Sequence, residues 1–284
     1  MPTLDLPRIA IFAAGLVCVT FHAAGQSPQM QKVTFEVGTV SQADVSQRLR
    51  RLRSKDSERE AELKAMFAEE GCTGEQMAEE VVQRKDPPNI ICTLPGTTQS
   101  RIIVGAHFDH APEGDGAVDD WSGASLLPSI YEALKAGPRK HTIELIGFTL
   151  EERGLLGSAL HVKHLTAEQR DSIRAVVNLE CLGLASTEVW VHAADPRLLD
   201  LLDRLAWSVK IPLKRVDVQA VGNDDTQAFR DKKIPSITLH SLTQESLLVI
   251  HSRRDKLAAV NAEKLYESFR LAAQYVAYLD QVLE

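Results

Sequence analysis

Short hydrophobic runs alternate with segments of helical spacing along most of the chain. The runs expected to form strands are residues 102–104, 141–150, 175–179, 188–192 and 234–240. Between them apolar residues recur every three or four positions, as on the buried face of a helix. The expected helices include residues 122–134, 154–165, 196–210 and a C-terminal helix capped by Asn261. This alternation predicts an α/β fold in which a mainly parallel or mixed sheet is covered on both faces.

An arginine-rich stretch lies within the first expected helix, which begins at Ser41. Its apolar positions Val45 and Leu49 follow helical spacing, and arginines occupy the other faces. These arginines are expected to form a solvated surface: Arg48, Arg50, Arg51 and Arg53.

Polar residues of the kind that bind metals stand where several hydrophobic runs end. One such residue alone is more often structural or part of a solvated rim. Several at one edge of one sheet are harder to explain in that way, because parallel strands place their chemistry at their carboxyl ends. The residues concerned are His107 and Asp109, Asp119 and Asp120 in the following loop, Glu151 and Glu152, Glu180, and His251.

This set of side chains suits a hydrolase with two metal ions. Histidine and carboxylate ligands without thiolates are typical of zinc. One carboxylate would bridge the metals, and another would stay free to take a proton from a metal-bound water. His107 and Asp109 project to the same side of their strand, so the carboxylate can orient the imidazole from behind. The residues alone do not separate Asp119 from Asp120, or Glu151 from Glu152.

The ordered segments HFD, DDWSG, EERGLLGS, NLECLG and IHSRRD resemble the di-zinc aminopeptidase family. That family includes secreted bacterial leucyl aminopeptidases, and its relatives include glutaminyl cyclases. The resemblance covers roughly residues 41–284. It implies a three-layer α/β/α sandwich around a mixed, mostly parallel twisted sheet.

The same resemblance assigns roles residue by residue. It implies that one zinc is bound by His107, Asp119 and Glu180. It implies that Asp119 also bridges to a second zinc, which Glu152 and His251 complete. Glu151 would then be the general base, and Asp109 the carboxylate behind His107. The expected reaction is hydrolysis of the N-terminal residue from peptides that have a free N-terminus.

Several positions depart from the family pattern. Asp120 stands where asparagine is common, and Glu180 is longer than the usual aspartate. Trp121 replaces a small residue, and is expected either to line the substrate pocket or to pack beneath the loop. Thr226 stands where the family often has a histidine, so a substrate-contacting histidine is expected to be missing.

Two other functions stay open at this point. A glutaminyl-peptide cyclotransferase would use one zinc and retain many of the same residues. A catalytically silent domain of this fold would have lost ligand positions, and no such loss is seen. The net charge of −7 argues against a general nucleic-acid binder, because neutralising phosphates requires a basic surface.

Residues 9–21 are an apolar run of the length of a signal-peptide core. We expect cleavage near Gly25, so that residues 1–25 are a signal peptide and residues 26–284 a single zinc-peptidase-like catalytic domain. The mature chain would be secreted or periplasmic, without stable membrane association. An uncleaved anchor and a buried N-terminal helix are the alternatives.

Three cysteines would remain after loss of Cys18 with the signal peptide. One disulfide and one free thiol is the simplest arrangement in an oxidising compartment. We expect Cys72 to pair with Cys92 and Cys181 to stay free. The alternative is three buried free thiols.

Overall fold

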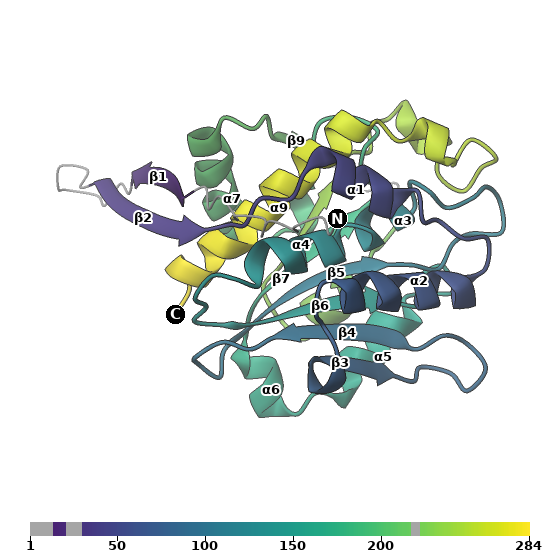
Figure 1. The fold of residues 1–284 in the computed structure, drawn as a ribbon, viewed down its shortest axis with the longest axis horizontal. Helices are drawn as coiled ribbons and strands as arrows, with labels where there is room; N and C mark the ends of the chain where they lie inside the picture. Colours follow the sequence, from purple (N-terminus) through teal and green to yellow (C-terminus); the bar gives the residue numbers. More distant parts are fainter. Residues whose placement is uncertain (1–13, 21–29, 217–221) are drawn as a thin grey trace, which may run out of the picture.

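The computed structural model describes residues 14–20, 30–216 and 222–284, in which strands and helices alternate (Figure 1). The strands are β1 (Ala14–Thr20), β2 (Met30–Glu36), β3 (Met77–Glu80), β4 (Asn89–Leu94), β5 (Arg101–His107), β6 (Thr142–Phe148), β7 (Ile173–Glu180), β8 (Glu188–Trp190), β9 (Lys214–Val216) and β10 (Ser236–His240). The α-helices are α1 (Gln42–Leu49), α2 (Asp56–Glu69), α3 (Trp121–Ala124), α4 (Leu127–Leu134), α5 (Leu156–His164), α6 (Ala167–Ser172), α7 (Pro196–Val209), α8 (Thr226–Arg230) and α9 (Ala262–Val282). Short 3-10 helices are η1 (Gly74–Gln76), η2 (Val191–Ala193), η4 (Ser246–Leu248) and η5 (Leu257–Ala259).

An eight-stranded mixed sheet forms the middle layer, with strand order β3-β4-β6-β5-β7-β10-β8-β9. The four central strands, β6, β5, β7 and β10, are parallel to one another. On the outer sides, β4 runs antiparallel to β6 and β8 runs antiparallel to β10. The predicted mixed α/β sheet is therefore confirmed, and the carboxyl ends of its central strands meet at one edge.

Hydrophobic cores lie on both faces of this sheet. In β5, Ile102 and Val104 belong to one core and Ile103 to the other, as the alternation of a strand requires. Helices α1, α2, α4, α7 and α9 contribute to the first core, and α5 and α8 to the second. Figure 1 shows α5 across the sheet from α4 and α9. The three-layer arrangement follows from these two packed faces.

The expected helix over residues 122–134 is interrupted in the structure. Helix α3 ends at Ala124, and α4 begins at Leu127 with Pro128 in its first turn. Proline lacks a backbone N–H and crowds the carbonyl four residues earlier, so the first turn of a helix tolerates it better than the interior.

The expectation that the arginine-rich stretch is solvated was wrong for Arg48. This side chain is buried, and its Nη2 lies 2.6 Å from Glu70 and 2.7 Å from Glu132. Its Nη1 also donates to the hydroxyl of Ser129 at 2.8 Å. Glu70, directly after α2, and Glu132, on α4, are the partners that make this burial tolerable.

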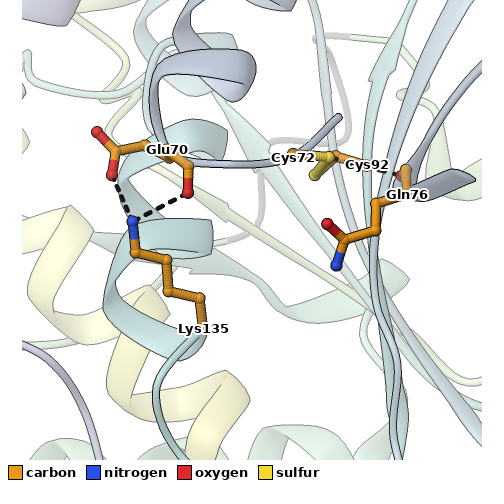
Figure 2. The surroundings of a disulfide bond; sticks show 5 residues. All are labelled: Glu70, Cys72, Gln76, Cys92 and Lys135. Carbon is orange, nitrogen blue, oxygen red and sulfur yellow. Dashed lines mark hydrogen bonds and ion pairs between the residues drawn. A yellow bond between two sulfur atoms is a disulfide. The ribbon is translucent and has the colours of Figure 1, made fainter. Parts of the chain in front are cut away.

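The predicted Cys72–Cys92 disulfide is present and ties the segment after α2 to β4 (Figure 2). Its cysteines are 20 positions apart. Closing a loop of this length lowers the entropy of the unfolded chain and so stabilises the folded protein by about 3 kcal/mol. On the other side of the same segment, Lys135 donates to the carbonyl and carboxylate of Glu70 at 2.9 and 2.8 Å. Cys181 is a buried free thiol, as expected.

Most of the predicted signal peptide lies outside the described residues. Within it, β1 pairs antiparallel with β2, and cleavage near Gly25 stays a prediction. Among the described residues, no helix has both the length and the hydrophobicity needed to span a membrane.

Glu80, at the end of β3, links the edge of the sheet to α5. Its carboxylate accepts a hydrogen bond from Asn89 at 2.8 Å and lies 3.2 and 3.1 Å from Nδ1 of His161 and His164. Burial alone would raise the pKa of Glu80, but the hydrogen bonds from His161 and Asn89 outweigh it and lower the pKa to about 2.

We therefore predict that Glu80→Gln lowers stability in a pH-dependent way. Ionised Glu80 contributes fully to stability above the pKa of about 4.3 that glutamate has in the unfolded chain. This contribution disappears as the pH falls through the folded-state pKa of about 2. At pH 7 the loss should be about 1–3 kcal/mol. Urea denaturation of wild type and variant at several pH values measures it, with exposed Glu75→Gln as control. An equal loss at pH 7 and near pH 2 would contradict the prediction.

Candidate metal centre

The carboxyl ends of three neighbouring parallel strands deliver most of the candidate residues to one place. His107 is the last residue of β5, and Glu180 is the last residue of β7. Glu151 and Glu152 follow β6 by a few residues. The loop after β5 brings Asp119, and the segment after η4 brings His251. Sequence positions that are far apart thus meet because their strands are adjacent.

Asp119 lies between the two histidines and directs one oxygen to each. Its Oδ1 is 3.1 Å from Nε2 of His107, and its Oδ2 is 3.0 Å from Nε2 of His251. Glu180 lies 3.4 Å from the same nitrogen of His107, and Glu152 lies 3.2 Å from that of His251. We call His107, Asp119 and Glu180 the first half-site, and Asp119, Glu152 and His251 the second.

The donor atoms of both half-sites fit zinc. Zinc bonds of about 2.0–2.1 Å in tetrahedral geometry place neighbouring ligand atoms about 3.3 Å apart. The four separations between a histidine nitrogen and a carboxylate oxygen in these half-sites, 3.0–3.4 Å, match this spacing. Each half-site also combines imidazole nitrogen with carboxylate oxygen, the ligand types that zinc accepts.

The charges at the site also favour bound cations. Burial raises the pKa of Glu180, and the charge of Asp119 raises it further. Burial likewise raises the pKa of Glu151 to about 10, with further contributions from Glu180 and Asp225. Carboxylates crowded in a buried space resist ionisation unless positive charge compensates them. Divalent cations held by the two half-sites would supply that charge.

Asp109 organises the site through the main chain. Its carboxylate accepts the backbone N–H groups of Glu151 at 3.1 Å and of Glu152 at 3.2 Å. Its carbonyl oxygen lies 3.2 Å from Nδ1 of His107, closer than its carboxylate at 3.5 Å. A proton held on Nδ1 by this carbonyl leaves Nε2 of His107 free as a ligand. Asp109 therefore orients residues of both half-sites.

Asp120 and Trp121 both bind main-chain groups, and Asp120 also lies near His107 and Glu180. The Oδ1 atom of Asp120 accepts N–H groups from Gly123 and Cys181, each at 3.0 Å, which joins the loop to the end of β7. Trp121 is fully buried, and its indole N–H donates to the carbonyl of Leu49 at 2.9 Å. Of the two alternatives for Trp121, packing beneath the loop is the one observed.

Two residues that hold the backbone near the site were not predicted from the sequence. Asp255 accepts the N–H of Val118 at 2.7 Å and of Asp119 at 3.1 Å, and so holds the bridging residue's backbone. It lies within the IHSRRD segment, which was the available signal. Arg59 of α2 is fully buried and donates to carbonyls of the loop after β5. Nothing in the sequence around Arg59 distinguishes it from a surface arginine.

Backbone conformation at the site is unusual at three residues. Leu150, Cys181 and His251 have φ values of +58°, +50° and +50°, in the left-handed region that side chains other than glycine rarely adopt. The first precedes Glu151, the second follows Glu180, and the third is itself a candidate ligand. Strain of this kind is common where a site dictates the direction of its side chains.

A pocket opens beside the first half-site, and Asp119, Glu151 and Glu180 are among its lining residues. His240, the last residue of β10, also lines it. His110, in the loop after β5, pairs with Asp56 at 2.8 Å and is not among the residues that line this pocket. Thr226, which stands where a histidine was expected, directs its N–H and hydroxyl to Asp224.

We predict that Arg59→Met strongly destabilises the protein. The change leaves the carbonyls of Phe108, Asp115 and Gly116 without their buried donor, at a cost of roughly 3 kcal/mol or more. Denaturant unfolding measures the loss. Exposed Arg50→Met is the matched control and should change stability little. Similar stability of the two variants would show that Arg59 does not hold this loop.

Comparisons with known proteins place the chain in a family. The model of peptidase family M28 matches residues 89–276. Aminopeptidase YwaD of Bacillus subtilis is 26% identical over 211 residues, covering 71% of this chain and 45% of YwaD. Leupeptin-inactivating enzyme 1 of Streptomyces exfoliatus is 26% identical over 151 residues, covering 52% of this chain and 34% of that enzyme. The chain thus spans less than half of these two curated relatives.

Solved structures share the fold at low sequence identity. The LapA aminopeptidase of Legionella pneumophila has a TM-score of 0.72 and 22% identity, with 86% of this chain and 72% of that chain covered. A glutaminyl cyclase of an Acidobacteriales bacterium has a TM-score of 0.71 and 17% identity, with 92% and 99% covered. Because the matched region runs from β4 into α9 and includes every candidate ligand, the chain belongs to peptidase family M28.

Proposed function

We propose that this chain is a zinc-dependent aminopeptidase that removes N-terminal residues from peptides by means of two zinc ions. The observation that carries the proposal is Asp119, whose two oxygens face His107 and His251 separately. A carboxylate in this position can join two metal ions. The aminopeptidases among the relatives support the same reaction.

His107, Asp119 and Glu180 would hold one zinc, and Asp119, Glu152 and His251 the other. When bound, zinc ions of this kind lower the pKa of water and stabilise negative charge on a carbonyl oxygen. The side chain of His251 is 57% exposed, so the second half-site opens toward solvent and incoming substrate.

Glu151 is the proposed general base. It belongs to neither half-site, yet its Oε2 lies 3.9 Å from Nε2 of His107. Burial raises the pKa of Glu151, and zinc ions held beside it would favour the ionised carboxylate that can accept a proton. It would accept the proton of the attacking water and then pass it to the leaving amine. Asp109 keeps Glu151 in place through its backbone N–H.

Selection of a free N-terminus follows from charge. The pocket beside the first half-site is lined by the acidic Glu151 and Asp224, which belong to neither half-site. These groups attract the α-ammonium of a peptide and disfavour an acylated terminus, which has no charge to be attracted. The enzyme would therefore remove N-terminal residues and would not cleave within the peptide.

Glutaminyl-peptide cyclisation with one zinc is the second candidate. The observation in its favour is that the fold of the Acidobacteriales cyclase is matched over 99% of its length. The two complete half-sites favour hydrolysis, since cyclisation would leave the second without a purpose. They also argue against a silent domain, because every position expected to bind zinc carries a residue that can do so.

We further propose that the chain is exported to a secreted or periplasmic location. The apolar run of residues 9–21 has the length of a signal-peptide core. The Cys72–Cys92 disulfide suits an oxidising compartment.

Glu151→Gln tests the mechanism. Loss of the base should lower kcat/KM about 10²–10⁴-fold on an unblocked aminoacyl amide, with zinc content unchanged. Exposed Glu168→Gln on α6 is the control and should behave as wild type. N-acetylated amides should not be cleaved by any form. Full activity of Glu151→Gln, or equal cleavage of acetylated amides, would refute the proposal.

A further inference from the structure

The pocket beside the first half-site contains polar groups that the proposed chemistry does not use. Its lining includes the apolar residues Leu242 and Ile250 together with Trp190 and His240. His240 is only 2% exposed and Trp190 only 5% exposed. Both side chains are thus nearly enclosed by protein, although they border a pocket that opens at the metal centre.

The hydrogen bonding of His240 determines its tautomer. Its Nδ1 accepts the backbone N–H of Leu242 at 3.0 Å, so this nitrogen carries no proton. Because Nδ1 accepts this hydrogen bond and carries no proton, the ring is neutral. A neutral imidazole with an unprotonated Nδ1 carries its proton on Nε2. That Nε2–H is buried and has no partner among the described residues.

Trp190 supplies a second donor of the same kind. Its indole N–H is also buried without a partner among the described residues. His240 pairs with Glu188 across the β10–β8 ladder, and Trp190 is two residues further along β8. Side chains two apart share a face, so Trp190 and His240 project from the same side of the sheet.

Two unpartnered donors in one pocket call for an acceptor from outside the protein. A buried N–H without a partner costs about 1–3 kcal/mol, and protein interiors rarely contain one. The hydroxyl of Thr238, which lines the same pocket, already donates to Asp224 and has no further proton to offer. The buried donors left without a partner among the described residues are the N–H groups of His240 and Trp190, and the exposed Asn223 also lines the pocket.

The charge of the lining restricts what that acceptor is. No lysine or arginine is among the described residues that line the pocket, whereas Glu151 and Asp224, which belong to neither half-site, are. A carboxylate side chain would therefore be buried beside these like charges with no lysine or arginine to pair with it. An aliphatic side chain would leave both donors unpaired. A neutral side chain with a carbonyl oxygen satisfies both conditions.

We propose that this pocket receives the side chain of the substrate's N-terminal residue, and that His240 and Trp190 select a neutral hydrogen-bond acceptor such as the amide of glutamine or asparagine. The inference rests on the proposed hydrolysis at the metal centre and names its substrate class. His240 and Trp190 are then the residues that determine specificity.

Cleavage of matched aminoacyl amides by the zinc-loaded protein tests the selection. Glutaminyl amide should be the best substrate, ahead of leucyl amide by about tenfold or more, because a site built to hydrogen-bond rejects analogues that lack the group. Glutamyl amide should be the poorest of the three. A preference for leucyl over glutaminyl amide would overturn the inference. No cleavage of any amide would instead refute the proposed hydrolysis.

Substitutions of His240 and Trp190 test whether these residues cause the selection. His240→Phe keeps an aromatic ring but removes Nε2–H, and should lower kcat/KM for glutaminyl amide at least tenfold while that for leucyl amide is unchanged or higher. His240→Gln, which restores an N–H donor, should recover part of the loss. Trp190→Phe should act in the same direction, and exposed Trp207→Phe on α7 is its control. Equal effects on both amides would mean that the two residues only support the fold.

Binding measured without turnover gives an independent result. Calorimetric titration with free glutamine and free leucine, the expected products, should show tighter binding of glutamine to wild type. His240→Phe should abolish that difference. Equal affinities in wild type would contradict the selection even if activity proved difficult to measure.

Product identity separates this inference from the reaction itself. Free glutamine is the product of hydrolysis, whereas a cyclic product with release of ammonia would refute the proposed aminopeptidase function. In that case a preference for glutamine that depends on His240 would still support the pocket's selectivity.

Discussion

The burial of several carboxylates at one edge of the sheet is the constraint on which the rest of the structure depends. Asp119 lies within hydrogen-bond distance of two histidines, and Glu151, Glu152 and Glu180 converge on the same pair. Such a cluster keeps its carboxylates ionised only when cations compensate their charge. The neighbouring loops hold the carboxylates close together, in positions that suit bound cations.

The loops owe this shape to buried polar groups that bind main chain rather than metal. Asp109 holds the turn with the two glutamates, Asp255 holds the backbone of Asp119, and Arg59 holds carbonyls of the loop after β5. Left-handed backbone at Leu150, Cys181 and His251 aims the neighbouring side chains. One set of residues would hold the ions, and another set fixes the positions of the first.

Much of this arrangement was predictable because it depends on local pattern. The hydrophobic run at residues 102–104 marked the central strand, and the polar residues after each run marked the edge where the site lies. The choice between Asp119 and Asp120 was different, since adjacent aspartates look alike in a sequence. In the structure Asp119 faces both histidines, whereas Oδ1 of Asp120 accepts N–H groups of Gly123 and Cys181, and the assignment of Asp119 as the bridging ligand stays a prediction.

Other features depend on contacts between distant positions, which no local pattern encodes. Arg59 is buried because a loop some 50 residues later packs over it, with Gly116 among its partners. Strand β9 was not predicted because Lys214 and Arg215, which are exposed at the sheet edge, give no hydrophobic pattern in the sequence. The tautomer of His240 follows from one backbone N–H, that of Leu242. Turn geometry of this kind appears only in three dimensions.

The most direct test of the central claim is the zinc content of the purified chain, measured by native mass spectrometry while zinc is titrated in. We predict two zinc ions per chain at saturation. Asp119→Ala should weaken both, because its two oxygens serve both half-sites, while Asp120→Asn should still bind two. A single zinc at saturation in the wild-type chain, or two ions bound normally by Asp119→Ala, would contradict the bridging role from which the proposed function is derived.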